Sequence, residues 1–535
     1  MEPRTSLGAI VLTLAIAVAA TAKDSPARRP YVPLFGLGSA PRGPDGRQNL
    51  PPDQLEAIAR HFSTIDGLFT EADAKRLHEL NAAIKLLPYL NSTYTSGSAE
   101  AAEYERTCRP AIAMWRAGVL ADSISADATT LAVKDTGQGK FPFLTSTAKG
   151  DVTASAAEFV SWVRVGDELM KVTGIDPAGG NLQVVRGFDK TAPAAHAAAS
   201  LVFAPVYIGS SVGTLGAGNG LPGRAPRNAV RYCLYPDNAE VWNRKAHAII
   251  RHVQDGFDGA FLDILAPSFF NQGSALGQHV RPWNFAKSAP YSQYDWGTAQ
   301  MMKINAFQQL TKEATGKQPC LVGNNMNRKY FDEEGGGRRY LFPTPEKPNP
   351  IQGMMSESPF SKPTAKDPFV AETAWRNSVQ ELMDAGQNKL AALPYCKTGG
   401  ESDTAARNAT IERIELHDYC SFLLAYEPDS PMQFAMPIFA GSRRGARTVN
   451  LPDHLFVNLG TPQDRVPYPQ LDKYKHPGEH TYRRRYSGGI VLVNPSDRDD
   501  ASIAIDAEYR DYKTHEPVRT LSVPAHSARL LTTIP

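Results

Sequence analysis

Two acidic residues stand at the ends of apolar runs, a position from which a carboxylate can transfer protons or act as a nucleophile. Asp263 ends the run that starts at Gly259, and Glu357 ends the run 351–357. Continuous apolar runs beside glycine are typical of strands buried on both faces of a parallel sheet. Two such acids could supply the nucleophile or base and the general acid that cleave a glycosidic bond. The alternative for Asp263 is that it only caps the segment that follows it.

Other polar and aromatic residues follow strand candidates or lie in the loops after them, where they could contact a substrate. The residues expected to do so are Tyr94, Tyr235, Asp237, Asn324, Asn325, Trp283 and Tyr395. Trp283 belongs to an aromatic-rich loop after Asp263, whose rings would stack on the apolar faces of sugars or pack in a core. Asp237 could instead be the N-cap of the next helix, and Asp66 is a further candidate acid.

The segments that would position these residues alternate between apolar runs and amphipathic helical patterns. Counted from Phe62, after an extended stretch at 31–40, there are eight strand candidates with seven mostly helical segments between them. The candidates are 62–69, 84–91, 229–235, 259–263, 320–325, 351–357, 389–395 and 432–436. This count predicts an α/β fold, a (β/α)8 TIM barrel in which Asp263 ends the fourth strand and Glu357 the sixth. The carboxyl ends of barrel strands open into one shared site.

Two stretches depart from this rhythm and consist of short alternating strands separated by turns. Residues 121–205 are predicted to be a small all-β module inserted in a barrel loop, so that the barrel comprises 23–120 and 206–450. Residues 451–535 are predicted to be a C-terminal antiparallel β-sandwich domain. Its arginine run, 483–485, is expected to lie on solvated faces of a strand rather than to form a binding patch.

The first 22 residues have the pattern of a secretory signal peptide. Arg4 precedes an apolar run at 7–20, and Ala20-Thr-Ala22 matches a small-residue cleavage site. A membrane anchor is the alternative, but this run is shorter than the roughly 20 residues that span a bilayer. We therefore expect a secreted or periplasmic protein that has no membrane partner once residues 1–22 are removed.

Composition narrows the possible partners and cofactors. The 57 Lys+Arg and 55 Asp+Glu nearly cancel and form no long block, so a nucleic-acid partner is not expected. The five cysteines are scattered without a CxxC pair, which fits neither a zinc site nor a disulfide-dense scaffold, although one disulfide remains possible. No HExxH motif occurs, so neither a catalytic metal nor any other cofactor is expected.

A resemblance adds to these residue patterns. The run 258–263, Asp-Gly-Ala-Phe-Leu-Asp, resembles the DG-x-F-x-D strand of secreted glycoside hydrolase-like TIM barrels. Segments 87–94, 235–242 and 482–495 are similar to that group as well. The resemblance implies hydrolysis of a carbohydrate substrate and a catalytic role for Asp263, while Glu357 matches a later acidic strand end of the group. A non-catalytic carbohydrate-binding protein on the same barrel is the main alternative.

Two further motifs are weaker signals. Residues 209–213 fit G-x-S-x-G with Ser211 in the nucleophile position, but a nucleophile elbow needs a helix next and a glycine-rich stretch follows instead. Residues 218–223 fit G-x-G-x-x-G, yet Pro222 and the absence of a helical pattern argue against a dinucleotide site. An esterase that uses Ser211 is therefore a second, less favoured alternative.

Overall fold

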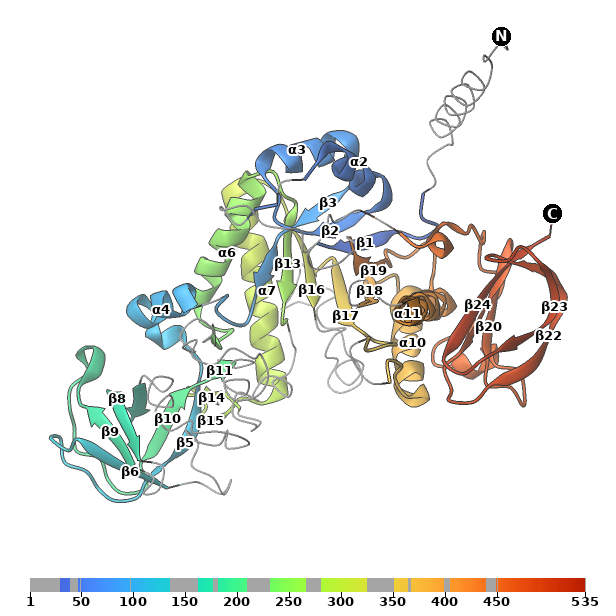
Figure 1. Cartoon of the computed structure of the whole chain (residues 1–535). Helices are drawn as coiled ribbons and strands as arrows, with labels where there is room; N and C mark the ends of the chain where they lie inside the picture. The colour runs from blue at the N-terminus through green and yellow to red at the C-terminus, as the bar shows by residue number, and fades with distance from the viewer. Residues whose placement is uncertain are drawn as a thin grey trace, which may run out of the picture.

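The computed structural model describes residues 29–38, 47–48, 50–96, 98–134, 162–176, 181–208, 231–265, 281–324, 351–363, 367–398, 405–438, 449 and 451–534. A central α/β barrel lies between two β-rich parts (Figure 1). One is a small barrel inserted in the first half of the chain, and the other is a C-terminal sheet drawn in red.

Nine short parallel strands form the central sheet, in the order β3-β2-β1-β19-β18-β17-β16-β13-β4. They are β1 (Leu34–Leu37), β2 (Thr64–Asp66), β3 (Lys85–Leu87), β4 (Tyr89–Asn91), β13 (Gly259–Asp263), β16 (Cys320–Asn324), β17 (Gly353–Glu357), β18 (Ala392–Tyr395) and β19 (Phe434–Pro437). β3 and β4 are halves of one strand on either side of Pro88, which has no N–H to donate to the ladder. β3 pairs with β2 and β4 pairs with β13, so the sheet closes into an eight-stranded barrel. The predicted (β/α)8 fold is confirmed.

One predicted barrel strand was wrong. Within 229–235 the structure has β12 (Arg231–Tyr232), which pairs antiparallel with β11 (Tyr207–Ile208) outside the barrel sheet. The eighth strand of the barrel is instead β1, which pairs parallel with both β2 and β19. The sequence had predicted this segment only as an extended stretch. Four residues beside a loop carry too little periodicity to be recognised as a strand. Since one strand replaces another, Asp263 and Glu357 still end the fourth and sixth strands.

Helices alternate with the barrel strands and bury one apolar side against them. They are α2 (Pro52–His61), α3 (Glu71–Leu80), α6 (Ala239–Gln254), α7 (Gln293–Thr315), α10 (Glu372–Gln387) and α11 (Ala405–Ala425). In α6 the buried apolar side includes Val241, Ile249 and Val253. Thr70 is the N-cap of α3, and its side chain accepts a hydrogen bond from the backbone N–H of Asp73. α4 (Ser98–Thr107) lies beside the inserted barrel instead (Figure 1).

The insert is a closed six-stranded barrel in the order β10-β5-β6-β9-β8-β7. Its strands are β5 (Met114–Leu120), β6 (Thr130–Lys134), β7 (Trp162–Val165), β8 (Glu168–Asp176), β9 (Asn181–Val185) and β10 (Leu201–Pro205). It begins at Met114 and not at the predicted residue 121, because Met114 pairs with Pro205 at the point where the chain leaves the insert. Inside it, buried Glu168 accepts hydrogen bonds from Arg186 and contacts His196.

The C-terminal β domain is present as one five-stranded antiparallel sheet, ordered β20-β21-β24-β22-β23. Its strands are β20 (Tyr482–Tyr486), β21 (Gly489–Asn494), β22 (Asp500–Asp511), β23 (Pro517–Val523) and β24 (Ser527–Thr533). Register shifts in β22 accompany a curl of the sheet, so that its β22 and β23 side covers β21 as a second layer would. β21 is therefore buried on both faces: Val491 packs toward the barrel and Ile490 toward the second layer.

The arginine run is only partly solvated. Strand alternation points Arg483 and Arg485 outward, while the side chain of Arg484 is 1 % exposed. The Arg484 guanidinium donates to the carbonyls of Leu423 and Tyr426 at 3.1 and 2.7 Å and pairs with Glu427 at 3.0 Å. The run therefore has one solvated face, within the expectation of one or two, and Arg484 lies on the buried face. Sequence could not show that the helix end of α11 lies opposite this strand.

Candidate active site at the carboxyl end of the barrel

Strand alternation decides which side chains face the barrel interior. One buried cluster lines that interior and consists of Phe35, Leu87, Phe261, Val322, Met355, Leu393, Tyr395 and Ala435. Residues two apart on a strand share a face. Asp263 follows Phe261 by two, Asn324 follows Val322, and Glu357 follows Met355. These three side chains therefore lie on the inward face where the strands end, together with Tyr395.

Asp263 is held by three hydrogen-bond donors. Asn324 Nδ2 and the backbone N–H of Ile264 each donate to Oδ1 at 2.9 Å, and the Tyr89 hydroxyl donates to Oδ2 at 2.5 Å. The carboxyl group is half-buried on β13. Because every one of these partners donates, the arrangement suits a charged carboxylate in a fixed orientation. Asn324, predicted as a substrate contact, here orients the candidate catalytic acid.

Glu357 is the more exposed of the two acids. Its side chain is 45 % exposed, and the ammonium of Lys397 lies 3.9 Å from its carboxylate. β17 pairs with β18 so that Glu357 lies level with Tyr395. Burial raises the pKa of the Tyr395 hydroxyl, and Cys396, Glu357 and Asp66 raise that pKa further. The acids Glu357 and Asp66 therefore lie near the same phenol at the barrel mouth.

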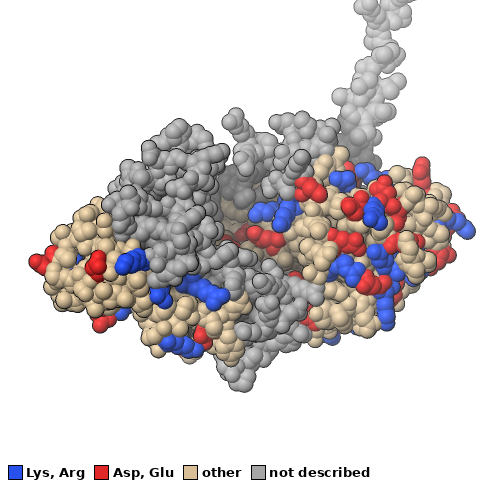
Figure 2. All heavy atoms as spheres, turned by 90° about the horizontal axis from the view of Figure 1, so that it is seen from below, with Lys and Arg blue, Asp and Glu red and all other residues tan. Residues whose placement is uncertain are grey.

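The two candidate acids face the mouth from strands separated by one neighbour. β16 lies between β13 and β17, and two interstrand steps of about 4.8 Å place those strands roughly 10 Å apart. Both side chains point inward from these strands, which leaves room for a substrate between them. Viewed from below, acidic and basic side chains gather on the described surface beside a central hollow (Figure 2).

Three predicted substrate contacts lie elsewhere, in the core between the barrel and the insert. Tyr94 is fully buried in an apolar cluster that also contains Trp296. The Tyr235 hydroxyl accepts from the backbone N–H of Met114 and donates to the carbonyl of Trp283, both at 3.0 Å. Trp283, on β14 (Trp283–Asn284), is itself buried. All three side chains are buried in that core, so their position does not favour the predicted contact with a substrate, which stays a prediction.

The remaining predicted contacts have different outcomes. Asp237 is exposed and accepts a hydrogen bond from the Tyr291 hydroxyl at 2.6 Å. It is not the N-cap of α6, since Asn238 accepts from the first-turn backbone N–H groups. Asn325 and Ser211 lie outside the described residues.

Two residues at the mouth were not predicted as substrate contacts. Tyr89 is 42 % exposed, yet its hydroxyl reaches Asp263. Asp66, the further candidate acid, ends β2 and is 9 % exposed. The signal was present in the two-residue period of the strands, because Tyr89 shares the face of inward-pointing Leu87.

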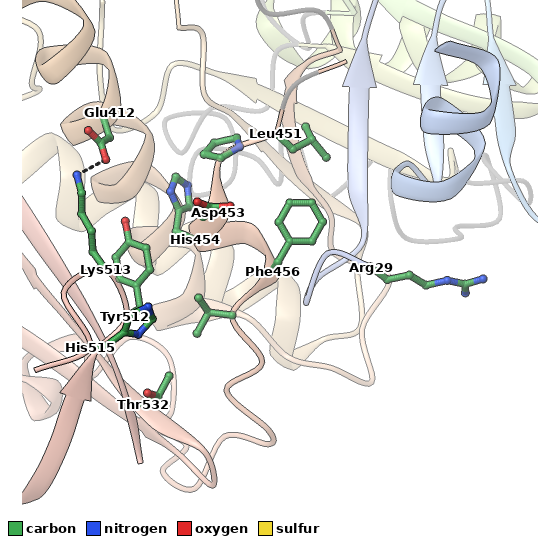
Figure 3. A pocket seen from close by; sticks show the side chains of 12 residues that line it. Arg29, Glu412, Leu451, Asp453, His454, Phe456, Tyr512, Lys513, His515 and Thr532 are labelled. Carbon is green, nitrogen blue, oxygen red and sulfur yellow. Dashed lines mark hydrogen bonds and ion pairs between the residues drawn. The ribbon is translucent and has the colours of Figure 1, made fainter. Parts of the chain in front are cut away.

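Metal-binding clusters, membrane helices, thiols and cavities are the other features of the described residues that could carry a function. Within them, no group of three or more His, Cys, Asp or Glu could hold a metal ion, and no helix is long and apolar enough to cross a membrane. All five cysteines are free thiols. A cavity of about 910 Å³ opens between α11, the segment 451–457 and the C-terminal sheet (Figure 3). None of the predicted site residues lines it.

No family model matches the chain, and no curated protein sequence matches it either. Solved structures are similar at low identity. The glycoside hydrolase domain of PelA from Pseudomonas aeruginosa aligns with a TM-score of 0.33 at 10% identity, covering 76% of this chain and 95% of that one. Eubacterium rectale Amy13B aligns with a TM-score of 0.39 at 10% identity, covering 96% and 98%. The alpha-amylase from H. orenii aligns with a TM-score of 0.35 at 11% identity, covering 94% and 99%.

Likeness at these TM-scores assigns no activity. The side chains at the barrel mouth have to carry the functional proposal.

Proposed function

We propose that the protein hydrolyses glycosidic bonds of an oligo- or polysaccharide, with Asp263 as nucleophile or base and Glu357 as general acid. The observation that carries this proposal is the pair itself. Both acids end parallel barrel strands and share the inward face of the sheet. The carboxyl end of a (β/α)8 barrel is where its active sites lie. Two carboxyl groups that flank one bond are what glycoside cleavage requires.

The surroundings of each acid suit a different role. Asp263 accepts three hydrogen bonds, which hold a charged oxygen ready to attack the anomeric carbon or to take a proton from water. Glu357 faces the same mouth from β17, and the complementary role of delivering a proton to the leaving oxygen as the glycosidic bond breaks falls to it. Tyr89 adds an exposed ring beside the reacting centre, where it can contact a sugar.

The test replaces each acid by its neutral isostere and measures turnover and binding separately. Asp263→Asn and Glu357→Gln should each lower kcat about 10²- to 10⁴-fold on an active polysaccharide while oligosaccharide binding persists. Asp506→Asn is the matched control, since this acid is exposed on β22 of the C-terminal sheet, away from the barrel mouth. Reducing-end assays over a polysaccharide panel give kcat, and titration calorimetry gives Kd.

The same experiment decides the rival function. If the wild-type protein binds an oligosaccharide but releases no reducing ends from any member of the panel, the barrel is a carbohydrate-binding scaffold. Turnover that survives both substitutions would instead remove Asp263 and Glu357 from the chemistry.

We further propose that the protein is exported and acts in the periplasm or outside the cell. The support is the pattern of residues 1–22, which lie outside the described part of the chain. N-terminal sequencing of protein recovered from the extracellular or periplasmic fraction should start at Lys23. Recovery of the intact chain from the membrane fraction would contradict export and favour an anchor.

A further inference from the structure

The backbone turns sharply directly after Asp263. Ile264 has a φ of 55°, in the left-handed region that a β-branched residue rarely adopts. At the start of this turn, the backbone N–H of Ile264 donates to Asp263 Oδ1 at 2.9 Å. Strained backbone at a candidate catalytic residue persists only where its surroundings hold it in place. The question is therefore which groups hold the Asp263–Ile264 turn.

Two adjacent residues after β4 hold the carbonyls of that turn. Ser92 donates to the carbonyl of Asp263 twice, through its backbone N–H at 3.1 Å and its hydroxyl at 2.9 Å. The Thr93 hydroxyl donates to the carbonyl of Ile264 at 2.6 Å. Ser92 and Thr93 are at most 1 % exposed. Water therefore cannot readily replace these bonds, and the turn depends on where Ser92 and Thr93 lie.

Ser92 and Thr93 are in turn held from α7, one helical turn apart. Lys303 Nζ donates to the carbonyl of Ser92 at 2.7 Å, and Gln300 Nε2 donates to the Thr93 hydroxyl at 3.1 Å. Gln300 and Lys303 are 0 % and 1 % exposed. No carboxylate among the described residues pairs with Lys303. A buried lysine without a counter-charge is costly, and here its ammonium donates to the segment that supports Asp263.

We propose that Lys303 and Gln300 are positioning residues for Asp263, which act through Ser92 and Thr93 to hold the left-handed turn at Ile264. The inference rests on the proposed function only in calling Asp263 catalytic. Neither side chain touches the mouth. Each fixes a backbone segment that fixes the carboxylate, so their effect on turnover comes from orientation and not from substrate contact.

Lys303→Met is the first test, and Lys245→Met is its matched control. Lys245 is a similarly buried lysine on neighbouring α6. Its ammonium donates to the carbonyl of Tyr94 and to the carboxylate of Glu100, and neither of these residues is one of the two that hold the turn. Lys303→Met should lower kcat about 10- to 100-fold with little change in KM. Lys245→Met should leave kcat within about twofold, although both variants lose stability.

Crystal structures give a readout that does not depend on turnover. In Lys303→Met, Ile264 should leave the left-handed region or the Asp263 to Tyr89 contact should lengthen. Thr93→Val, an isosteric change that removes the same support directly, decides the matter if Lys303→Met does not fold. A turn and carboxylate left in place in both structures would overturn the inference, as would equal losses of kcat in Lys303→Met and Lys245→Met. If the wild-type protein has no turnover, the proposed function fails and the structures alone still decide the positioning.

Discussion

The chemistry at the barrel mouth depends on single atoms around Asp263. Its two oxygens face three donors, of which only the Tyr89 hydroxyl belongs to a side chain that is also substantially exposed. Tyr89 can therefore influence both the charge on Asp263 and the binding of a substrate. The other donors, from Asn324 and Ile264, lie in the barrel wall and serve orientation.

Replacing Tyr89 by phenylalanine should separate these two effects. Tyr89→Phe removes the 2.5 Å bond to Asp263 but keeps the ring. A hydrogen bond to a charged group is worth about 1.5–3 kcal/mol, so kcat should fall roughly 10- to 100-fold while KM changes little. Steady-state kinetics on an active polysaccharide measure both constants. Tyr294→Phe, at an exposed tyrosine of α7, is the control, and an unchanged kcat in Tyr89→Phe would contradict the assigned contact.

Lys303 should leave a signature in the pH dependence of stability. Burial and the nearby charge of Lys245 lower the pKa of Lys303 to about 7, whereas an unfolded lysine titrates near 10.4. Between about pH 7 and 10.4 the unfolded chain holds a proton that the folded chain lacks. The contribution of Lys303 to the free energy of unfolding therefore increases as pH rises through this range and decreases as pH falls toward 7.

The measurement is the difference between wild type and Lys303→Met, because other groups titrate in the same range. Urea unfolding at pH 7.5 and pH 9.5 should show that wild type gains stability relative to the variant at the higher pH. Parallel curves for the two proteins would mean that the pKa of Lys303 is not lowered by folding.

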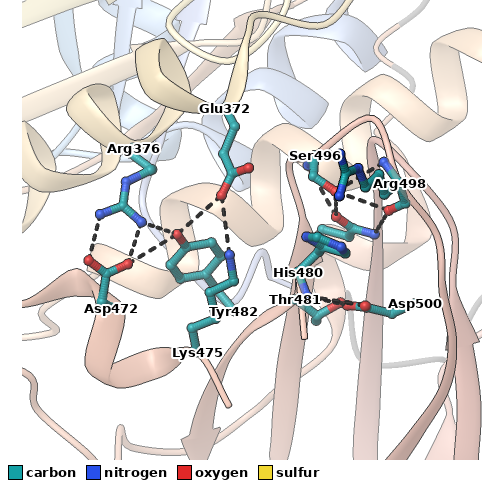
Figure 4. Close-up of polar contacts among 11 residues, drawn as sticks. Glu372, Arg376, Asp472, Lys475, His480, Thr481, Tyr482, Ser496, Arg498 and Asp500 are labelled. Atoms are coloured by element: carbon teal, nitrogen blue, oxygen red, sulfur yellow. Dashed lines mark hydrogen bonds and ion pairs between the residues drawn. The ribbon is translucent and has the colours of Figure 1, made fainter. Parts of the chain in front are cut away.

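At the scale of elements, side chains of the C-terminal part dock on helices of the barrel. Arg376 of α10 pairs with Asp472 and contacts the Tyr482 hydroxyl, while Glu372 reaches Lys475 (Figure 4). Arg484 of β20 binds the last carbonyls of α11, which have no partner within the helix. The positive guanidinium also complements the negative end of the α11 dipole. β20 thus completes a helix that belongs to the barrel.

Arg484→Met should destabilise the protein strongly. The substitution leaves several α11 carbonyls buried without their donor and removes the buried partner of Glu427 Oε1, while Arg465 stays on Oε2. Breaking a buried charge pair costs about 3–5 kcal/mol. Arg485→Met is the control, since Arg485 is 41 % exposed and its pair with Asp506 is worth at most about 1 kcal/mol. Urea unfolding of both variants at pH 7 measures the difference. Equal losses of stability would show that the buried guanidinium contributes no more than an exposed one.

For the whole molecule, one hydrophobic core extends from the barrel into the C-terminal domain. Its members include Ile65 and Phe434 on barrel strands, and Tyr482, Val491 and Leu530 on strands of the C-terminal sheet. The two parts lie side by side (Figure 1). The barrel and α11 cover the apolar face of the sheet. Separating the two parts would expose apolar side chains of both to water and would therefore lower the stability of each.

A chain that ends at residue 450 is therefore expected not to fold cooperatively. Removing the sheet exposes the apolar side of α11 and leaves its carboxyl end without Arg484. Denaturant unfolding followed by circular dichroism should show a broad transition or none. A chain that lacks only residues 1–22 is the control and should unfold in one sharp transition, and a sharp transition in both would show that the barrel is independent of the C-terminal sheet.

Much of the barrel could be predicted because its strands are apolar runs with helical patterns between them. Seven of the eight barrel strands were placed this way, since each buries both faces and therefore reads as a continuous run. The segment 229–235 was predicted as a barrel strand in place of β1, because local sequence does not show which apolar run pairs with its neighbours in the barrel sheet. The start of the insert was misplaced for the same reason, since only the pairing of Met114 with Pro205 marks it.

The sequence by itself determined that Asp263 and Glu357 end strands of the barrel, because each acid closes an apolar run of the kind that a parallel sheet buries on both faces. Only the tertiary structure decided which other residues join them. Tyr89 and Asn324 reach Asp263 across strand neighbours, whereas Tyr94, Tyr235 and Trp283 are buried beside the insert. The physical reason is that contacts between segments far apart in the chain depend on how strands and helices pack, and local residue patterns do not record that packing.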